Sequence, residues 1–331
     1  MILDNIAVSI ICNTYNQESY IKDALESFVK QKTTFKFEVL VHDDASTDKT
    51  PEIIREYEQK YPDIIKPLYQ TENQYSKGGN ITLRFQVPRA RGKYLALCEG
   101  DDYWTCDTKL QEQWEYMEAH PECSLVTHET MNYYEKEDFF KPYLAEDYSV
   151  PKDRIIPVAD IIRRHSDIFH TSSLFYKKDY YNQHSEFLKT VVGYDYVPKT
   201  LLACQGTVYM IPKVMSVHRI GAKNSCHERW DADKSRLIKM KEVAIDNYTA
   251  INQYTAYKYN EYIEARLLVL NFQLYLITCD KNITQEPYKS MFANMPLRRK
   301  CAYYINVYCP WCYIFLRGLR RKLQYKWKLK G

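Results

Sequence analysis

The sequence predicts a doubly wound α/β sheet followed by a helical extension. Through the first hundred residues, short apolar runs alternate with segments whose apolar residues recur at helical spacing. Polar and acidic residues follow three of the apolar runs, as expected where the strands of an open α/β sheet end and ligands bind. Between residues 230 and 277 the chain contains neither Gly nor Pro, which is typical of helices.

The expected elements follow from these patterns in chain order. Strands are expected at 7–12, 38–42, 64–68, 94–99, 125–127, 172–176, 207–211 and 214–217. Helices are expected at 21–31, 51–60, 80–91, 109–120 and 195–204, and again between 230 and 277. Thr47 or Asp48 can cap the helix at 51–60, and Pro51 sits where no N–H donor is needed. Residues 129–157 are polar and rich in Tyr, and we expect an insertion or a substrate-facing loop there.

Length and composition exclude several classes of protein. The 331 residues are 45% hydrophobic, which is enough for a large core and excludes a disordered chain. Only 9 Gly and 13 Pro are present, which excludes collagen-like, propeller-like and low-complexity repeats and means that most loops turn without Gly. The ten cysteines are scattered and are interpreted as reduced thiols of a cytoplasmic protein. No signal peptide is expected, because Asp4 precedes only a short apolar stretch.

The net charge of +4 is unevenly distributed. Residues 298–331 hold ten Lys and Arg and no acid, so subtracting these ten charges leaves −6 for residues 1–297. This acidic body argues against binding of nucleic acid. The uncharged aromatic run 301–316, flanked by cations, is too short to span a bilayer and predicts an anchor on an anionic membrane surface. A helix packed on the catalytic domain, with a solvated basic end, is the alternative.

Three polar clusters carry the chemical prediction. They read Asn-Thr-Tyr-Asn-Gln-Glu from residue 13, His-Asp-Asp-Ala-Ser-Thr-Asp from residue 42, and Glu-Gly-Asp-Asp from residue 99. No glycine-rich phosphate loop follows a strand, which argues against dinucleotide-binding and P-loop chemistry. Acidic clusters at one sheet edge repel one another unless a cation lies among them, and the Glu-x-Asp pattern suits Mg²⁺ or Mn²⁺. Taken singly, each cluster is also what ordinary turn chemistry produces.

The three clusters in this order resemble the inverting GT-A glycosyltransferases of family 2, which use nucleotide-sugars. The resemblance is carried by VSIICNTYNQESYIKDALESFVKQ, FEVLVHDDASTDKTPEII and ARGKYLALCEGDDYW, and it extends over about residues 7–220. It implies a GT-A fold, the nucleotide-diphospho-sugar transferase version of the doubly wound mixed sheet, with a helical C-terminal extension. It also implies donor contacts at Thr14, Tyr15, Asn16, Glu18, Asp44, Ser46 and Glu99. Asn13 stands where the family usually has Pro, which should alter only the turn.

The resemblance further implies a metal site and a base. Glu99 replaces the first Asp of the family's D-x-D motif, so Asp101 is the expected ligand of Mg²⁺ or Mn²⁺, and Glu99 is expected to contact ribose or a metal-bound water. Asp195, at the start of the helix expected at 195–204, matches the position of the family's catalytic base, although an Asp there is also an ordinary helix cap. Arg219 is expected to neutralise the leaving phosphate, and His218 to contact metal or phosphate or to be structural.

The sequence therefore predicts an inverting, metal-dependent glycosyltransferase. A sugar is expected to move from a UDP-sugar donor, the common case for the family, to a saccharide or lipid-linked saccharide acceptor while Asp195 takes the proton. We expect a catalytic domain at 1–222, a helical extension at 223–297 and a basic aromatic tail at 298–331, in a cytoplasmic protein that is peripheral at the inner face of the cell membrane if the tail binds lipid. A catalytically silent nucleotide-sugar-binding protein is the alternative, whereas a nucleotidyltransferase would need a Gly-rich loop.

Overall fold

The computed structural model describes residues 3–165, 167–222 and 234–309. Its strands are β1 (Leu3–Thr14), β2 (Phe35–Asp43), β3 (Ile65–Tyr69), β4 (Tyr94–Leu97), β5 (Tyr103–Trp104), β6 (Cys123–Tyr134), β7 (Phe139–Pro142), β8 (Phe175–Lys177) and β9 (Thr207–Ile220). Its helices are α1 (Ile21–Val29), α2 (Thr50–Lys60), α3 (Lys109–Ala119), α4 (Val158–Arg163), α5 (Asp179–Gln183), α6 (Ser185–Thr190), α7 (Tyr196–Gln205), α9 (Lys234–Tyr254), α10 (Asn260–Thr278), α11 (Lys289–Ala293) and α12 (Leu297–Tyr308).

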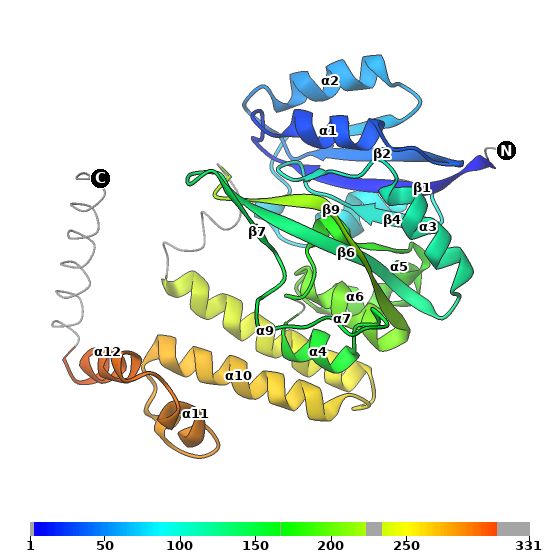
Figure 1. Cartoon of the computed structure of the whole chain (residues 1–331). Helices are drawn as coiled ribbons and strands as arrows, with labels where there is room; N and C mark the ends of the chain where they lie inside the picture. Colours follow the sequence, from blue (N-terminus) through cyan, green and yellow to red (C-terminus); the bar gives the residue numbers. More distant parts are fainter. Residues whose placement is uncertain (1–2, 166, 223–233, 310–331) are drawn as a thin grey trace. The chain divides into compact units, whose positions relative to one another are not determined.

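Within the described residues the strands form one mixed sheet. Its order is β3-β2-β1-β4-β8-β6-β9-β5, with β7 added to β6 (Figure 1). The N-terminal half is parallel, because β1 pairs in parallel with β2 and β4, and β2 with β3. β8 runs antiparallel to both β4 and β6 and so joins this half to the parallel pair of β6 and β9. The predicted mixed α/β sheet is confirmed.

The main core lies around the strands that are buried on both faces. β1 contributes Val8, Ile10 and Cys12, all fully buried, which explains why its sequence is almost continuously apolar. Leu25 and Phe28 of α1 belong to the same core, and the Phe28 ring meets the Trp104 ring edge-on at 4.8 Å. Burying side chains of this size contributes about 1.5–3 kcal/mol each. The core therefore fixes the strands whose ends build the site.

The prediction of a regular helix at 80–91 is wrong. The structure has a short π-helical turn at Thr82–Gln86 followed by a 3₁₀ turn at Val87–Arg89. Pro88 has no N–H to continue a helical ladder. The buried Gln86 amide instead donates to the main-chain oxygens of Cys12 (3.1 Å) and Leu40 (2.8 Å), so the segment is bound to the sheet rather than to itself.

The segment at 129–157 is also more regular than expected. β6 continues to Tyr134, and β7 pairs antiparallel with it as a ribbon. The two strands expected on either side of Pro212 are one strand, β9. The register shifts between the pairs His128↔Ile211 and Glu129↔Val214, so Pro212 lies in a bulge where it needs no partner for an N–H.

The helices expected between 230 and 277 are confirmed as α9 and α10. The chain divides into two compact units, Met1–Ala232 with Thr249–Ile263, and Asp233–Tyr248 with Glu264–Gly331. The second unit has its own small core, which includes Phe272, Ile283, Phe292 and Tyr303. Among the described helices, none is both long enough and apolar enough to cross a bilayer. Residues 310–316 of the expected membrane-surface run lie outside the described residues.

Candidate functional site

The ends of three parallel strands bring the three polar clusters together. The loop after β2 is joined to the end of β1 by the bond from the Asp44 N–H to the Thr14 carbonyl oxygen (3.0 Å). The turn after β4 is joined to the same strand end by the bond from the Gly100 N–H to the Asn13 carbonyl oxygen (3.1 Å). The three polar clusters therefore lie together at one edge of the sheet, as the sequence predicts.

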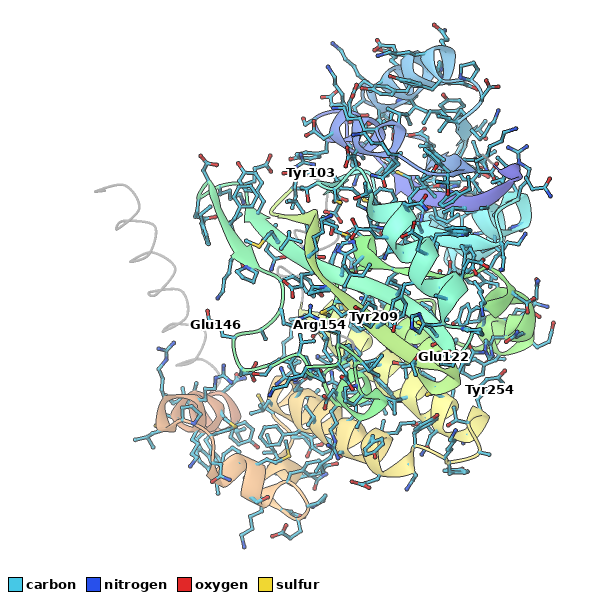
Figure 2. All side chains as sticks on the ribbon, turned by 45° about the vertical axis from the view of Figure 1, so that its right-hand side comes forward. Tyr103, Glu122, Glu146, Arg154, Tyr209 and Tyr254 are labelled. Atoms are coloured by element: carbon cyan, nitrogen blue, oxygen red, sulfur yellow. The ribbon has the colours of Figure 1, made fainter. Side chains whose placement is uncertain are left out.

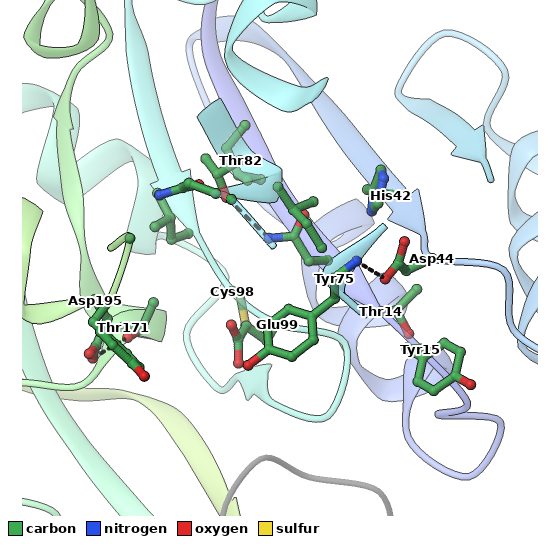
Figure 3. A pocket seen from close by; sticks show the side chains of 18 of the residues that line it. Thr14, Tyr15, His42, Asp44, Tyr75, Thr82, Cys98, Glu99, Thr171 and Asp195 are labelled. Atoms are coloured by element: carbon green, nitrogen blue, oxygen red, sulfur yellow. Dashed lines mark hydrogen bonds between the residues drawn. The ribbon is translucent and has the colours of Figure 1, made fainter. Parts of the chain in front are cut away.

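A cavity of about 260 Å³ opens at this edge, and Figure 3 shows its lining. Of the residues expected at the site, those that line it are Thr14, Tyr15, Asp44, Glu99, Asp101 and Asp195. Sequence reasoning missed other lining residues, which come mainly from the segment between β3 and β4 and include Asn73, Tyr75, Asn80 and Thr82. Gly78 and Gly79, both at positive φ, were the available signal of an unusual loop there.

Asp44 holds the segment between β3 and β4 in place. Its carboxylate accepts the main-chain N–H groups of Gln74 (2.7 Å) and Tyr75 (3.0 Å), and Figure 3 marks the bond to Tyr75. A carboxylate offers about four acceptor positions, so Asp44 can hold this segment and still accept a hydrogen bond from a ligand. Beside it, burial lowers the pKa of His42 to about 4, which keeps the imidazole neutral at this wall of the cavity.

Asn16, Glu18 and Ser46 do not line the cavity but join the loops that do. The Asn16 N–H donates to Ser46 Oγ (2.9 Å), and Glu18 Oε2 accepts the N–H of Lys49 (3.0 Å). Asn16 and Ala45 have φ of 53° and 63°, so both loops turn through the left-handed region without Gly, as the composition predicts. These side chains thus hold the shape of the wall on which Tyr15 and Asp44 lie.

The turn after β4 concentrates negative charge. Glu99 and Asp101 line the cavity, whereas Asp102 is buried with 1% of its surface exposed. Enclosure by the cavity walls, and then the charges of Asp101 and Asp195, raise the pKa of Glu99 to about 8. Burial, followed by the charges of Asp101 and Glu99, likewise raises the pKa of Asp102. Desolvation and the charges of neighbouring carboxylates therefore both favour protonation at this turn.

The residues at this turn fit a divalent cation. Mg²⁺ and Mn²⁺ bind through one or two protein carboxylates and take their remaining ligands from substrate phosphates and water. Glu99 and Asp101 supply such a pair, and a cation would offset the charge of Asp101 that, after desolvation, contributes to the raised pKa of Glu99. No group of three or more His, Cys, Asp or Glu within the described ranges forms an all-protein metal cage. The donor set thus suits a cation shared with a phosphate ligand.

Asp195 lies across the cavity from Asp44 (Figure 3). It is the residue before α7, and its Oδ2 accepts from Lys199 Nζ (2.8 Å) and from Thr171 Oγ1 (3.2 Å). Lys199 is buried, while 56% of the Asp195 side chain is exposed. Partial desolvation by the cavity walls favours the neutral form of Asp195, but the Lys199 ammonium and the hydrogen bonds from Lys199 and Thr171 outweigh it and hold the pKa of Asp195 below its usual value. Sequence reasoning missed Lys199, although a spacing of four residues on a helix was the signal for it.

Arg219 and His218 lie behind this turn and do not line the cavity. The Arg219 guanidinium pairs with Asp23 and donates to the Asp101 carbonyl oxygen (2.8 Å), and its main-chain N–H donates to Asp102 Oδ1 (3.0 Å). His218 Nδ1 lies 2.9 Å from Asn132 Oδ1, and its ring stacks on that of His170 at 4.0 Å. In this arrangement Arg219 holds the acidic turn in place from β9.

Comparison with known proteins identifies the family to which this chain belongs. Residues 9–186, more than half of the chain, match the family described as Glycosyl transferase family 2. The chain belongs to this family. The uncharacterised protein Rv1520 from Mycobacterium tuberculosis is 34% identical over 226 residues, which cover 67% of this chain and 61% of the relative. The chain thus spans under two thirds of the length of that relative.

Two further similarities concern characterised proteins. The UDP-Glc:alpha-D-GlcNAc-diphosphoundecaprenol beta-1,3-glucosyltransferase WfaP of Escherichia coli is 35% identical over 133 residues, covering 40% of this chain and 48% of WfaP. The mannosyltransferase PcManGT of Pyrobaculum calidifontis, whose structure holds GDP-Man and Mn²⁺, superposes with a TM-score of 0.55 at 18% identity, covering 92% of this chain and 82% of the other. The structural likeness confirms the GT-A fold of this family 2 member.

Proposed function

We propose that this glycosyltransferase moves a sugar from a UDP-sugar donor to a hydroxyl of a saccharide or lipid-linked saccharide, with inversion at the anomeric carbon. The observation that carries the proposal is that the ion-paired Asp195 shares one cavity with the Glu99 and Asp101 pair. A proton acceptor and a cation-binding turn are the two groups that such a displacement needs. The name of WfaP, which specifies UDP-Glc and a lipid-linked acceptor, supports this choice of donor and acceptor.

The wall formed by the loops after β1 and β2 would bind the donor. Thr14, Tyr15 and Asp44 would contact the base and ribose, and Asn16, Glu18 and Ser46 would keep their loops in the binding shape. Asp101, with Glu99 beside it, would hold Mg²⁺ or Mn²⁺, a choice supported by the Mn²⁺ in the PcManGT complex. When bound, the cation would offset the charge that builds on the leaving diphosphate.

Asp195 is suited to act as the base. Because Lys199 keeps its pKa low, Asp195 is ionised at neutral pH and its second oxygen can accept a proton. Asp195 would take the proton of the acceptor hydroxyl while that oxygen forms a bond to the anomeric carbon. The bond from that carbon to the diphosphate oxygen would break on the opposite face, and its electron pair would leave with the nucleoside diphosphate.

Arg219 and His218 remain secondary parts of the proposal. Neutralisation of the leaving phosphate by Arg219 would require its guanidinium to leave Asp23. Contact of His218 with metal or phosphate would likewise require a change, because its ring now stacks on His170. Both residues are buried or half-buried behind the acidic turn, so we assign Asp101 the main metal contact.

A donor screen tests the proposal. UDP-sugars, GDP-sugars and free UDP are added with and without Mn²⁺, and the unfolding temperature and release of nucleoside diphosphate are measured. A true donor binds the folded chain and raises its unfolding temperature by mass action. Asp101→Asn should abolish the Mn²⁺-dependent part of that rise. Binding without any turnover in the unaltered chain would instead favour the catalytically silent alternative.

We also propose that the basic end of the chain binds an anionic membrane surface. α12 begins at Leu297 and continues with Arg298, Arg299 and Lys300, and Tyr308 at its other end is 70% exposed. Aromatic rings and cations together favour the headgroup region, where each cation contributes up to about 1 kcal/mol. We further propose that the chain divides into a catalytic domain at 1–222, a helical extension at 223–297 and a basic aromatic tail at 298–331. Flotation with anionic vesicles tests it: changing the three cations to Gln should reduce flotation, and equal flotation would remove the claim.

A further inference from the structure

The ribbon of β6 and β7 carries exposed aromatic side chains that the proposed donor site does not use. Tyr133 lies opposite Phe140 and Tyr134 opposite Phe139 across the two strands. The rings of each pair are stacked, with centroids 4.7 Å apart for Tyr133 with Phe140 and 4.5 Å apart for Tyr134 with Phe139. Phe139 and Phe140 remain 43% and 52% exposed. Successive side chains of a strand point to opposite faces, so each face of the ribbon presents one stacked pair.

One of these faces adjoins a groove. A groove of about 410 Å³ is lined by Asn132 and Tyr134 of β6, by Lys141 of β7 and by the segment that follows β7. Asn132 and Lys141 lie opposite each other and two residues from Tyr134 and Phe139, so the Tyr134–Phe139 pair belongs to the groove face. The Tyr133–Phe140 pair belongs to the opposite face. Figure 2 shows Glu146, another lining residue, on the loop after β7.

The groove leads toward the proposed catalytic residues. Asn132 contacts His218, and Tyr143, which lines the groove, packs edge-on against the rings of His170 and His218. Burial raises the pKa of Tyr143 to about 12, and the charges that act on it include those of Lys199 and Asp195. Tyr143 thus connects the groove to the proposed base, because the residue after His170 is Thr171, whose hydroxyl donates to Asp195 Oδ2 (3.2 Å).

We propose that this groove and the Tyr134–Phe139 pair bind the acceptor as a neutral saccharide. A pyranose ring has a face of C–H groups that packs on the electron-rich face of an aromatic ring, while its hydroxyls need donors and acceptors around the edge. Asn132 and the ion pair of Lys141 with Glu146 (3.0 Å) supply such groups beside the rings. The inference rests on the proposed function, because it identifies the acceptor side of the same site.

The charge of the ribbon argues against a lipid surface as the occupant. The turn at 135–138 reads Glu-Lys-Glu-Asp, with three acids and one Lys, and Glu146 and Asp147 at the groove are balanced by Lys141 and Arg164, so the turn leaves this surface net negative. An anionic membrane would be repelled by this surface. A neutral sugar chain is not repelled, and carboxylates accept hydrogen bonds from its hydroxyls.

Oligosaccharide titration of the full chain tests the proposal. The probes are malto-, cello- and chito-oligosaccharides, with binding measured by saturation-transfer NMR and calorimetry. Phe139→Leu keeps an apolar side chain but removes the flat ring, and it should weaken binding of the best probe about tenfold, whereas Phe139→Trp should preserve it. Phe140→Leu is the matched control on the opposite face and should bind as the unaltered chain does.

Three results would overturn the inference. They are binding of no oligosaccharide, equal affinity of Phe139→Leu and Phe140→Leu, and binding of anionic vesicles that Phe139→Leu weakens but Phe140→Leu does not. Hydrolysis of UDP-glucose by the unaltered chain is measured in parallel and depends on the donor pocket alone. Hydrolysis without oligosaccharide binding would therefore refute the acceptor groove and leave the proposed function standing, whereas oligosaccharide binding without donor binding would refute the proposed function.

Discussion

Replacing Gly100 by Ala is expected to displace the acidic turn after β4, because the added methyl group collides with neighbouring side chains. A Cβ at this position would lie 2.5 Å from Gln17 Oε1 and 2.8 Å from Thr14 Oγ1. Ordinary contacts begin about 0.5–1 Å further out, so the turn has to move by roughly that distance, and overpacking of this kind typically lowers the free energy of unfolding by about 1–3 kcal/mol. Glu99 and Asp101 flank the substituted residue and would move with it.

The expected loss of activity is larger than the loss of stability suggests. Displacement of positioned groups by about 1 Å can lower turnover by roughly 10²-fold. Nucleotide-sugar turnover with Mn²⁺ and the free energy of unfolding are measured on the same samples of Gly100→Ala and the unaltered chain. We expect turnover to fall well beyond the fraction of chain that unfolds at the assay temperature.

Gly206→Ala is the matched control. Its Cβ would lie 2.4 Å from the Glu122 carbonyl oxygen, a clash as severe as that at Gly100, but Gly206 does not line the cavity. We expect a comparable loss of stability with turnover per folded molecule unchanged. Normal turnover of Gly100→Ala, or an equal loss of turnover in Gly206→Ala, would refute the placement of the acidic turn at the donor site.

Three further predictions concern single side chains. Asp44→Ala should weaken inhibition by free UDP and, because two main-chain N–H groups lose their acceptor, lower the free energy of unfolding by about 1–3 kcal/mol; an unchanged inhibition constant would contradict the pocket assignment. Lys199→Met removes the cation that lowers the pKa of Asp195, so the acid limb of the pH profile of kcat should move to higher pH. Burial lowers the pKa of Lys109 to about 7, so between that pH and about 10 the unfolded chain holds a proton that the folded chain lacks, and stability rises with pH; denaturation curves of Lys109→Met should lack this rise.

The N-terminal half of the fold could be predicted because its signals are local. β1, β2 and β4 are buried by helices or neighbouring strands, so their apolar runs are visible without knowledge of the partners. β6 and β9 could not be bounded in this way. Their outer halves are polar and stabilised by pairing with each other, and Pro212 reads as a break although a bulge accommodates it.

The site residues also fall into those that the sequence could locate and those that it could not. Strand ends located the carboxylates of Asp44 and Asp101, because sheet topology brings such ends together, whereas Asp195 was located by its match to the family's base at the start of a helix. The sequence could not separate side chains that face the cavity from those that bind a neighbouring loop, as Asn16 does with Ser46. Nor could it reveal that Lys199 is buried beside Asp195, since burial depends on the packing of α7.

Turnover and donor affinity of Asp195→Asn test the central claim most directly. The account assigns Asp195 to proton transfer and not to the donor, so the affinity for a UDP-sugar with Mn²⁺ should stay within about twofold while turnover falls by roughly 10²–10⁴-fold. Asn preserves the size of the side chain and can still meet Lys199 and Thr171 through its oxygen, which limits structural side effects. Normal turnover of Asp195→Asn would contradict the claim that this residue is the base.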